Sequence, residues 1–422
     1  MTLLEDLKAR GLVEAVTDPE IEKLLQTPQT VYCGFDPSAA SLQAGNLVSI
    51  MVLRRFQLAG HKVIALVGGA TGLIGDPSGK SAERNMLTVE QVAANKRGIR
   101  ENLSRILDFE GPNAAMLVDN YDWYSGTSAI EFLRDIAINF RVPQMLAKES
   151  VRKRLEASEG ALTFTEFSYQ ILQGNDFLHL FDNFGCSIEV GGADQWGNIT
   201  AGTDLVHRMR GKTAYGLTFP LLLDSSGKKF GKSEGNALFM DANLTSVYDW
   251  YQYFMRAADA DVIRYLKVFS LRSLDEIAGL ETQMKANPEG RIPQKALAEE
   301  ITRLVHGEEG LKTALGATQT LFGGSVEGKS ADELETIFKD VKSAEVSAAE
   351  VVGRPVYAVA AAAGMFKSNG EARRMAAQGG LYVNGEKADD KRVFADSDLI
   401  DGRIAVLRQG RKANFLLKAS RG

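Results

Sequence analysis

The chain has 422 residues, 45% of them hydrophobic and 24% charged, with a formal net charge of −5, which excludes a disordered or fibrous protein and predicts two to four domains. No run of about 18 apolar residues occurs, and the acidic, helically periodic first residues are unlike a signal or transit peptide, so no membrane partner is expected. Two widely separated cysteines and four scattered histidines argue against a disulfide framework and against a metal site, and they fit a reducing cytoplasm.

The first half of the chain alternates short apolar runs with helically spaced segments. Residues 30–35 and 62–69 are typical of buried strands, and residues 45–59 between them predict a helix. This βαβ pattern predicts an α/β fold with a doubly wound parallel sheet. Further strands are expected at residues 114–120 and 186–192.

Polar or glycine-rich turns follow these strands, at residues 33–36, 68–76, 120–123 and 191–195. Because ligands of such sheets bind beyond the carboxyl ends of the strands, we expect the four turns to meet at one crevice. Asp76 precedes Lys80 and Arg84 in a Gly/Ser-rich loop, which suits an ammonium group and phosphates, and Asp194 could hold ribose hydroxyls. Taken alone, each is equally typical of an ordinary surface loop.

Residues 164–181 predict a helix on which Tyr169, Gln173 and Asp176, at positions i, i+4 and i+7, share one face. Three hydrogen-bonding side chains on a covered stripe need partners. A solvent-exposed face is the alternative, and the flanking aromatic residues favour a covered one.

Residues 215–245 predict a meander with a turn at 224–227, and helices follow up to about residue 318. Within the meander, the stretch KKFGKSEGN places Lys229 and Lys232 around a glycine. A mobile cationic loop of this kind can close over a triphosphate and neutralise developing charge. In isolation, such a loop is more typical of a solvated turn.

The last part of the chain is basic. Residues 323–350 are polar and weakly periodic, typical of a linker that carries a short helix. Ser368 and Glu371 beyond it form a capping-box pattern. Residues 354–422 contain thirteen Lys or Arg and seven Asp or Glu, a net charge of +6 against about −11 for the rest. This favours a polyanionic partner, with chance surface composition as the alternative.

The motifs YCGFDP, GGATGLIGDPSG, NYDW, FTEFSYQILQGNDF, GGADQWGNI and KFGKS, in this order and spacing, resemble those of the bacterial tyrosyl-tRNA synthetases, which are class I aminoacyl-tRNA synthetases. The resemblance spans nearly the whole chain, and the tail resembles a small RNA-binding domain first named in a ribosomal small-subunit protein. It implies a Rossmann-like catalytic domain, then an α-helical domain and a small α+β RNA-binding domain. The implied bounds are 1–220 for the catalytic domain, with a dimer interface at about 121–160, 221–322 for the signature loop and anticodon-side helices, 323–350 for the linker and 351–422 for the RNA-binding domain.

The resemblance implies a homodimeric, cytoplasmic tyrosine–tRNA ligase. Such an enzyme activates L-tyrosine with ATP, accompanied by Mg²⁺, to tyrosyl-adenylate and pyrophosphate, and then transfers tyrosine to the 3′ end of tRNA(Tyr). No tightly bound cofactor and no protein nucleophile are needed, because catalysis comes from positioning and charge stabilisation.

Motif by motif, the resemblance also implies residue roles. Tyr32 and Asp176 would bind the substrate phenol, Asp76, Tyr169 and Gln173 its ammonium group, Gln195 would lie near its carboxylate, and Asn120 would support the pocket. The ATP site would comprise Cys33, Gly34, Asp36, Ser38, Gln43, Gly45, Asn46, Gly191 and Asp194. Pyrophosphate would be gripped by Lys80, Arg84, Lys229, Lys232 and Ser233. Charge alone nominates Lys367, Arg373, Arg374, Lys391, Arg392, Arg408, Arg411 and Lys412 for tRNA binding.

Two motifs depart from the family pattern. The family's phosphate-binding signature, His-x-Gly-His, reads Gln43-Ala44-Gly45-Asn46 here, which keeps the glycine. Gln and Asn each offer an amide N–H donor, as a neutral histidine does, so we expect activity to survive. KFGKS varies the KMSKS pattern but keeps both lysines and the serine.

Two alternatives stay open at this point. A tryptophan-specific relative would keep the fold, but it needs an indole pocket, whereas Tyr32 with Asp176 favours a phenol. A catalytically inactive RNA-binding paralogue is supported only by the missing histidines. The retained lysines and Asp194 argue against it.

Overall fold

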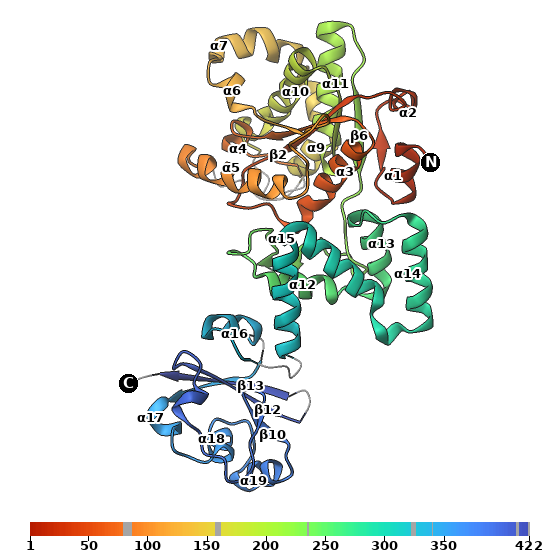
Figure 1. Cartoon of the computed structure of the whole chain (residues 1–422). Helices are drawn as coiled ribbons and strands as arrows, with labels where there is room; N and C mark the ends of the chain where they lie inside the picture. Colours follow the sequence, from red (N-terminus) through yellow and green to blue (C-terminus); the bar gives the residue numbers. More distant parts are fainter. Residues whose placement is uncertain are drawn as a thin grey trace. The chain divides into compact units, whose positions relative to one another are not determined.

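The computed structural model describes the chain except for residues 79–86, 157–161, 234–235, 322–325, 340, 411–412 and 421–422. The chain divides into two compact units, one of residues 1–245 with 252–306, the other of residues 246–251 with 307–422 (Figure 1). Helix α15 (Ile292–Leu321) departs from helical geometry at Gly307, whose φ is 72° and ψ −177°. None of the described helices is long and apolar enough to cross a membrane.

The first unit is built on a six-stranded sheet with the order β1-β6-β5-β2-β3-β4. Strands β6, β5, β2, β3 and β4 run parallel, and β1 pairs antiparallel with β6 at the edge. This confirms the predicted parallel α/β sheet. The strands are β1 (Ala15–Val16), β2 (Thr30–Phe35), β3 (Lys62–Val67), β4 (Met116–Asp119), β5 (Cys186–Gly192) and β6 (Tyr215–Phe219).

Helices cover both faces of this sheet (Figure 1). On one face lie α10 (Phe164–Phe184) and α11 (Trp196–Arg210), from which Phe177 and Leu205 share a buried core with Tyr32 and Ile64 of the strands. On the other, α3 (Leu47–Leu58) packs against β2 and β3. A helix on each side of a parallel sheet leaves the carboxyl ends of the central strands as the open edge.

The other helices of the first unit are α1 (Leu3–Ala9), α2 (Ile21–Leu24), α4 (Thr71–Ile74), α5 (Val89–Ser104), α6 (Tyr121–Tyr124), α7 (Ala129–Glu131), α8 (Val142–Leu146), α9 (Glu149–Glu156), α13 (Asp259–Phe269) and α14 (Leu274–Ala286). A π-helical turn, η2 (Phe132–Ile136), and a 3₁₀ turn, η3 (Ala137–Asn139), lie between α7 and α8. Helix α12 (Val247–Met255) follows residue 245, as the helical periodicity predicts.

The predicted meander over residues 215–245 is wrong at its start. Residues 215–219 form β6 and extend the parallel sheet, and only the remainder holds a turn and the short pair β7 (Lys232–Ser233) and β8 (Asn236–Ala237). Gly216 makes this segment less typical of a strand. A glycine is required at this position, because a Cβ there would lie 2.3 Å from the side chain of Ile199 on α11.

The second unit is a five-stranded sheet with the order β11-β10-β12-β13-β9. The predicted capping residue Ser368 begins a helix, with Oγ accepting from the backbone N–H of Glu371 at 3.2 Å. The segment 323–350, described above as a linker, contains a helix and the edge strand β9, which pairs with β13. The elements are α16 (Ala331–Ile337), β9 (Ser343–Ser347), α17 (Ala348–Val351), α18 (Val356–Ala362), α19 (Asn369–Ala377), β10 (Leu381–Val383), β11 (Glu386–Lys387), β12 (Ile404–Gln409) and β13 (Ala413–Ser420).

Candidate active site

A cavity of about 320 Å³ opens at the carboxyl ends of β2 and β5. The predicted turns at 33–36 and 191–195 line it, together with Asp76 and the predicted face of α10. Its lining includes fourteen of the predicted residues: Tyr32, Cys33, Gly34, Asp36, Ser38, Gly45, Asn46, Asp76, Tyr169, Gln173, Asp176, Gly191, Asp194 and Gln195.

Helix α10 supplies one wall of the cavity. Thr163 caps its start, with Oγ1 accepting from the backbone N–H of Glu166 at 3.2 Å. One turn further, the Tyr169 hydroxyl donates to Asp36 Oδ2 at 2.7 Å, and Gln173 Nε2 donates to Glu189 Oε1 at 2.8 Å. The Tyr169 oxygen and the Gln173 amide oxygen are therefore left as hydrogen-bond acceptors, which suits a cationic ligand.

Asp176 lies deepest on this helix face and is only 2% exposed. Its carboxylate accepts from Asn120 Nδ2 and from Trp123 Nε1, both at 2.9 Å. Burial raises the pKa of Asp176 to about 7, against the hydrogen bonds from Asn120, Trp123 and Tyr124. Asp176 is thus a buried acceptor held in one orientation.

Asn120 is a predicted site residue that does not line the cavity. Its Oδ1 accepts from the backbone N–H of Ala70 at 2.7 Å, and its Nδ2 donates to Thr71 Oγ1 at 3.0 Å as well as to Asp176. Thr71 in turn donates to Asp36 at 2.7 Å. Asn120 therefore ties the turn after β3 to α10.

Carboxyl groups dominate the electrostatics of the cavity. Asp76 accepts from Gln195 Nε2 at 2.8 Å and from the backbone N–H of Ser78 at 2.9 Å. Burial raises the pKa of Asp194, and the charge of Lys229 opposes that rise. Five carboxyl groups, and no Lys, Arg or His, line the cavity within the described part of the chain: Asp36, Asp76, Asp176, Glu189 and Asp194. A lining rich in carboxyl groups suits an ammonium group and repels anions, so we expect anionic phosphates to be held at the margin of the cavity.

The turn at residues 43–46 lies at that margin. It forms a 3₁₀ turn, η1 (Ala44–Asn46), in which Asn46 Oδ1 accepts from the backbone N–H of Gln43 at 3.0 Å. This bond fixes the amide of Asn46 and leaves its N–H₂ as the donor. Gly45 and Asn46 line the cavity, whereas Gln43 is outside its lining and forms a bridge with Phe239.

The KFGKS loop lies against this turn. Ala44 donates its backbone N–H to Leu238 at 2.8 Å, and a Cβ on Gly231 would lie 2.9 Å from the backbone nitrogen of Gly45. Gly231 has a φ of 85°, so a larger residue there would be both crowded and strained. Lys229 and Lys232 are exposed, and Ser233 is in strand β7. Lys80 and Arg84 lie outside the described residues.

Phe230 anchors the KFGKS loop. It is 6% exposed and packs against Tyr265 and Phe269, with ring centroids 5.0 and 4.9 Å away. Tyr253, which also contacts the Phe230 ring, accepts from the backbone N–H of Gly231 at 2.8 Å. An aromatic cluster of the helical segment thus fixes the base of the loop and leaves the lysines exposed.

We expect replacement of Phe230 by alanine to lower the free energy of unfolding by about 3 kcal/mol, because a buried aromatic ring is lost and a cavity remains. Urea denaturation of the variant and of Phe230→Leu measures this cost. Leucine fills most of the volume, so its cost is expected to be smaller, and equal stability of all three proteins would contradict the packing role.

In the second unit, several of the basic residues nominated for RNA are exposed: Lys367, Arg373, Arg374 and Lys391. Among these, Arg373 also pairs with Asp390 at 3.3 Å, and two further nominated residues make internal contacts. Arg392 pairs with Asp398 at 2.8 Å, and the Arg408 guanidinium lies 3.8 Å from the centroid of the Tyr382 ring. These contacts identify Arg392 and Arg408 as residues with a structural role as well. Arg411 and Lys412 lie outside the described residues.

Sequence reasoning missed three residues of the site: Thr71, Trp123 and Glu189. Glu189 carried a signal, because it is a lone charge inside the apolar strand CSIEVGG. Thr71 and Trp123 occur within quoted motifs, but nothing in their spacing relates them to Asp36 or Asp176.

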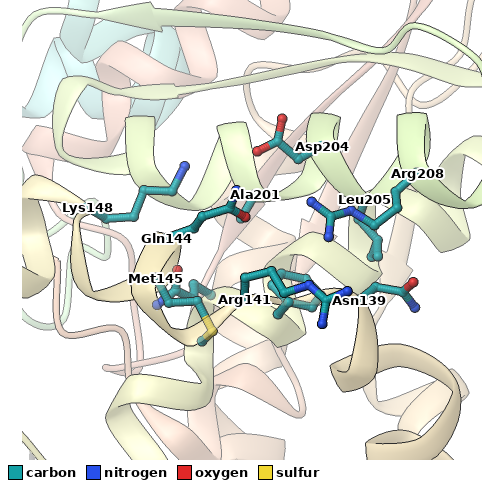
Figure 2. A pocket seen from close by; sticks show the side chains of 11 residues that line it. Asn139, Arg141, Gln144, Met145, Lys148, Ala201, Asp204, Leu205 and Arg208 are labelled. Carbon is teal, nitrogen blue, oxygen red and sulfur yellow. The ribbon is translucent and has the colours of Figure 1, made fainter.

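A second, smaller hollow of about 30 Å³ lies between residues 139–148 and α11. Figure 2 shows Gln144, Met145 and Lys148 on one side of it and Asp204 and Arg208 of α11 on the other. Its volume suits about one water molecule, so it is a packing seam and not a substrate site.

Family models and known proteins resemble this chain over nearly its whole length. The model described as tRNA synthetases class I (W and Y) matches residues 24–323, and that of the tyrosine–tRNA ligase SYY-like C-terminal domain matches residues 333–417. The tyrosine–tRNA ligase of Opitutus terrae is 47% identical, covering 99% of this chain and 100% of the relative. That of Geobacillus kaustophilus is 46% identical over the same shares.

Solved structures give the same picture. A C-terminally truncated mitochondrial tyrosyl-tRNA synthetase of Aspergillus nidulans matches with a TM-score of 0.69 and 29% identity, over 76% of this chain and 94% of the other. The tyrosyl-tRNA synthetase of Archaeoglobus fulgidus, with a TM-score of 0.56 and 18% identity over 75% of this chain and 100% of the other, supports the fold alone.

Proposed function

Since the chain belongs to the tyrosine–tRNA ligases of class I, we propose that the 320 Å³ cavity binds L-tyrosine with its phenol between Tyr32 and Asp176. The observation that carries this placement is Asp176, a buried acceptor with fixed donors on both oxygens, in a cavity whose Tyr32 hydroxyl is also buried. A phenol offers one donor and one acceptor, which matches this pair.

The ammonium group of tyrosine would lie among the acceptors described above. Asp76, the Tyr169 oxygen and the Gln173 amide oxygen surround the carboxyl-rich part of the cavity. Gln195 Nε2 donates to Asp76 at 2.8 Å, and its amide would lie near the substrate carboxylate. Binding both ends of tyrosine presents that carboxylate to the α-phosphate of ATP.

ATP, entering as its Mg²⁺ complex, would occupy the outer part of the cavity. Cys33, Gly34, Asp36, Ser38, Gly191 and Asp194 line it there, and Asp194 is suited to the ribose hydroxyls. Gly45 and Asn46 also line the cavity; Gly45 would allow close approach of the adenine, and the Asn46 amide N–H₂ would serve as a donor to the nucleotide. The exposed lysines Lys229 and Lys232 would neutralise the pyrophosphate as it leaves, and the 3′ ribose of tRNA(Tyr) would then accept tyrosine.

A second copy of this chain is the proposed partner of the segment at about 121–160, together with Phe164 at the start of α10 just beyond it. Large apolar side chains are exposed in this stretch, which is unusual for a surface that faces water: Ile130, Leu133, Ile138, Val142, Leu146 and Phe164 are between 43% and 72% exposed. The opposite side of the segment is already packed on α11 through the seam in Figure 2.

The paired substitutions Ile130→Glu and Ile138→Glu are expected to produce a monomer, because two charges would be desolvated at the interface of a homodimer. Sedimentation velocity over a range of concentrations measures the change. The paired control is Val89→Glu with Leu58→Glu, exposed apolar residues outside the segment. A wild-type protein that sediments as a monomer would contradict the proposed interface.

The second unit is proposed to bind tRNA(Tyr) through its exposed basic residues Lys367, Arg373, Arg374 and Lys391. Binding would then weaken steeply as the salt concentration rises. We also propose a cytoplasmic location, since Cys33 and Cys186 are buried thiols without a disulfide. The division at residues 220, 322 and 350 stays our proposal for the functional domains.

Tyrosine-dependent ATP–pyrophosphate exchange tests the proposed function, with phenylalanine and tryptophan as controls. Exchange with tyrosine alone is the expected result, and it would show that Gln43 and Asn46 suffice in place of two histidines. Exchange with tryptophan would overturn the phenol assignment. A folded protein that binds tRNA but shows no exchange would favour an inactive RNA-binding paralogue.

A further inference from the structure

Glu189 is a buried carboxyl group that the proposed mechanism does not yet use. It lies on β5 and is 2% exposed. In the sheet it is paired in register with Tyr32 on β2 and with Gly216 on β6. Glu189 and Tyr32 both line the cavity, so the sheet itself places this carboxyl beside the phenol that would contact the substrate.

Only one of the two carboxyl oxygens of Glu189 has a hydrogen-bond partner among the described residues. Its Oε1 accepts from Gln173 Nε2 at 2.8 Å. Its Oε2 and the Tyr32 hydroxyl are both buried, and neither has a hydrogen bond of standard geometry to any described residue. Two buried polar atoms without partners are costly, and a proton on the carboxyl can satisfy both. Burial raises the pKa of Tyr32, and the charge of the neighbouring Glu189 adds to the rise.

The surroundings of Glu189 favour its neutral form. Burial raises its pKa to about 8; the hydrogen bond from Gln173 and the nearby Tyr32 hydroxyl oppose the rise, and the negative charge of Asp176 adds to it. The titratable groups that face Glu189 are Tyr32 and Cys33 on β2, Asp176 on α10 and Cys186 on its own strand. Across β6 its neighbour is Gly216, and no cation contributes to the shift of its pKa.

We propose that Glu189 is a positioning residue of the tyrosine site, which as a neutral acid donates from Oε2 to the Tyr32 hydroxyl while its Oε1 orients the Gln173 amide. This inference rests on the proposed function. The Tyr32 proton is then directed into the cavity, where it is donated to the oxygen of the substrate phenol. The phenol proton is donated to Asp176. Each donor in this series of hydrogen bonds, from Glu189 through Tyr32 and the phenol to Asp176, then has one acceptor.

Ionisation of Glu189 breaks this order. A carboxylate only accepts, so it draws the Tyr32 proton away from the cavity. The phenol then has one proton for two acceptors, Tyr32 and Asp176. Ionisation of Glu189 is expected to weaken tyrosine binding at alkaline pH, whereas the binding of phenylalanine, which has no hydroxyl, does not depend on this ionisation. Selectivity for tyrosine over phenylalanine therefore falls as pH rises.

Calorimetric measurement of tyrosine binding from pH 6.5 to 9.5 tests the proposal in the full-length protein and in Glu189→Gln and Glu189→Met. Glutamine keeps a donor and an acceptor and does not ionise, so its Kd is expected to match the wild type at pH 7. From pH 7 to 9, the wild-type Kd should rise about tenfold more than that of Glu189→Gln. The substrate ammonium group and Asp176 titrate in both proteins, so their effects cancel when the wild type is compared with Glu189→Gln.

Methionine has a similar length and neither donor nor acceptor, so Glu189→Met should raise the Kd at every pH. Thermal melting gives a readout independent of binding. Because the folded-state pKa of Glu189 is raised, its contribution to stability is lost as pH rises from about 4.5 to 8. The melting temperature of Glu189→Gln, relative to that of the wild type, should therefore increase as pH rises over that range.

An equal alkaline rise in wild type and Glu189→Gln would overturn the inference, as would wild-type affinity in a folded Glu189→Met. If Glu189→Met does not fold, the comparison with Glu189→Gln still decides. Absence of tyrosine binding by the wild type at every pH would instead refute the proposed function. Binding without the pH difference refutes the role of Glu189 alone.

Discussion

Replacing Asp176 by asparagine is expected to lower kcat/KM for tyrosine by about 100-fold or more. The two carboxylate oxygens accept from Asn120 Nδ2 and Trp123 Nε1, so an amide turns its N–H₂ toward one of these donors. It also weakens the acceptor that the substrate phenol needs. A mismatched buried donor and a lost charge-assisted hydrogen bond together cost about 3 kcal/mol.

Pyrophosphate exchange as a function of tyrosine concentration measures this loss, with melting temperature as a check on folding. Asp182→Asn is the matched control, because Asp182 is on the same helix and pairs with Arg210 at 2.6 Å on a partly exposed surface. Surface pairs of this kind contribute little, so near wild-type activity is expected from it. Near wild-type kcat/KM in Asp176→Asn would contradict the placement of the phenol.

The part of the site that sequence reasoning predicted depends on short-range periodicity. Tyr169, Gln173 and Asp176 recur at helical spacing, and α10 spans the whole predicted segment. The strands at 30–35 and 186–192 have the predicted bounds, because each is a short and mostly apolar run; the first is followed by Asp36-Pro37 and the second ends in two glycines. Parallel pairing then brings their ends together.

The part that it missed depends on register and on long-range contacts. Nothing in the sequence near Glu189 indicates that its Cα is paired with that of Tyr32, since the two are separated by most of the catalytic unit. The bond from Trp123 to Asp176 likewise joins a short helix after β4 to α10. The sequence pattern did not identify β6 as a strand of the parallel sheet, because the close packing of Ile199 requires a glycine in it.

Lys229 and Lys232 are the other groups on which the chemistry is expected to depend. Replacing either by alanine should lower kcat for pyrophosphate exchange by about 100-fold, while KM for tyrosine changes little. Phe230 and Gly231 fix the base of the loop, and we expect the two exposed ammonium groups to contact the phosphates mainly as ATP reacts. Interactions made only in the transition state affect kcat and leave ground-state binding unchanged.

Lys228→Ala is the matched control for this prediction, because Lys228 is exposed and adjacent to Lys229 in the chain. Loss of general positive charge would reduce all three variants alike, whereas a specific contact with the leaving pyrophosphate would spare Lys228→Ala. Steady-state exchange at saturating tyrosine and ATP separates the two cases. A rise in KM for tyrosine without a fall in kcat would show instead that the loop binds the amino acid, and it would contradict the proposed role of the lysines.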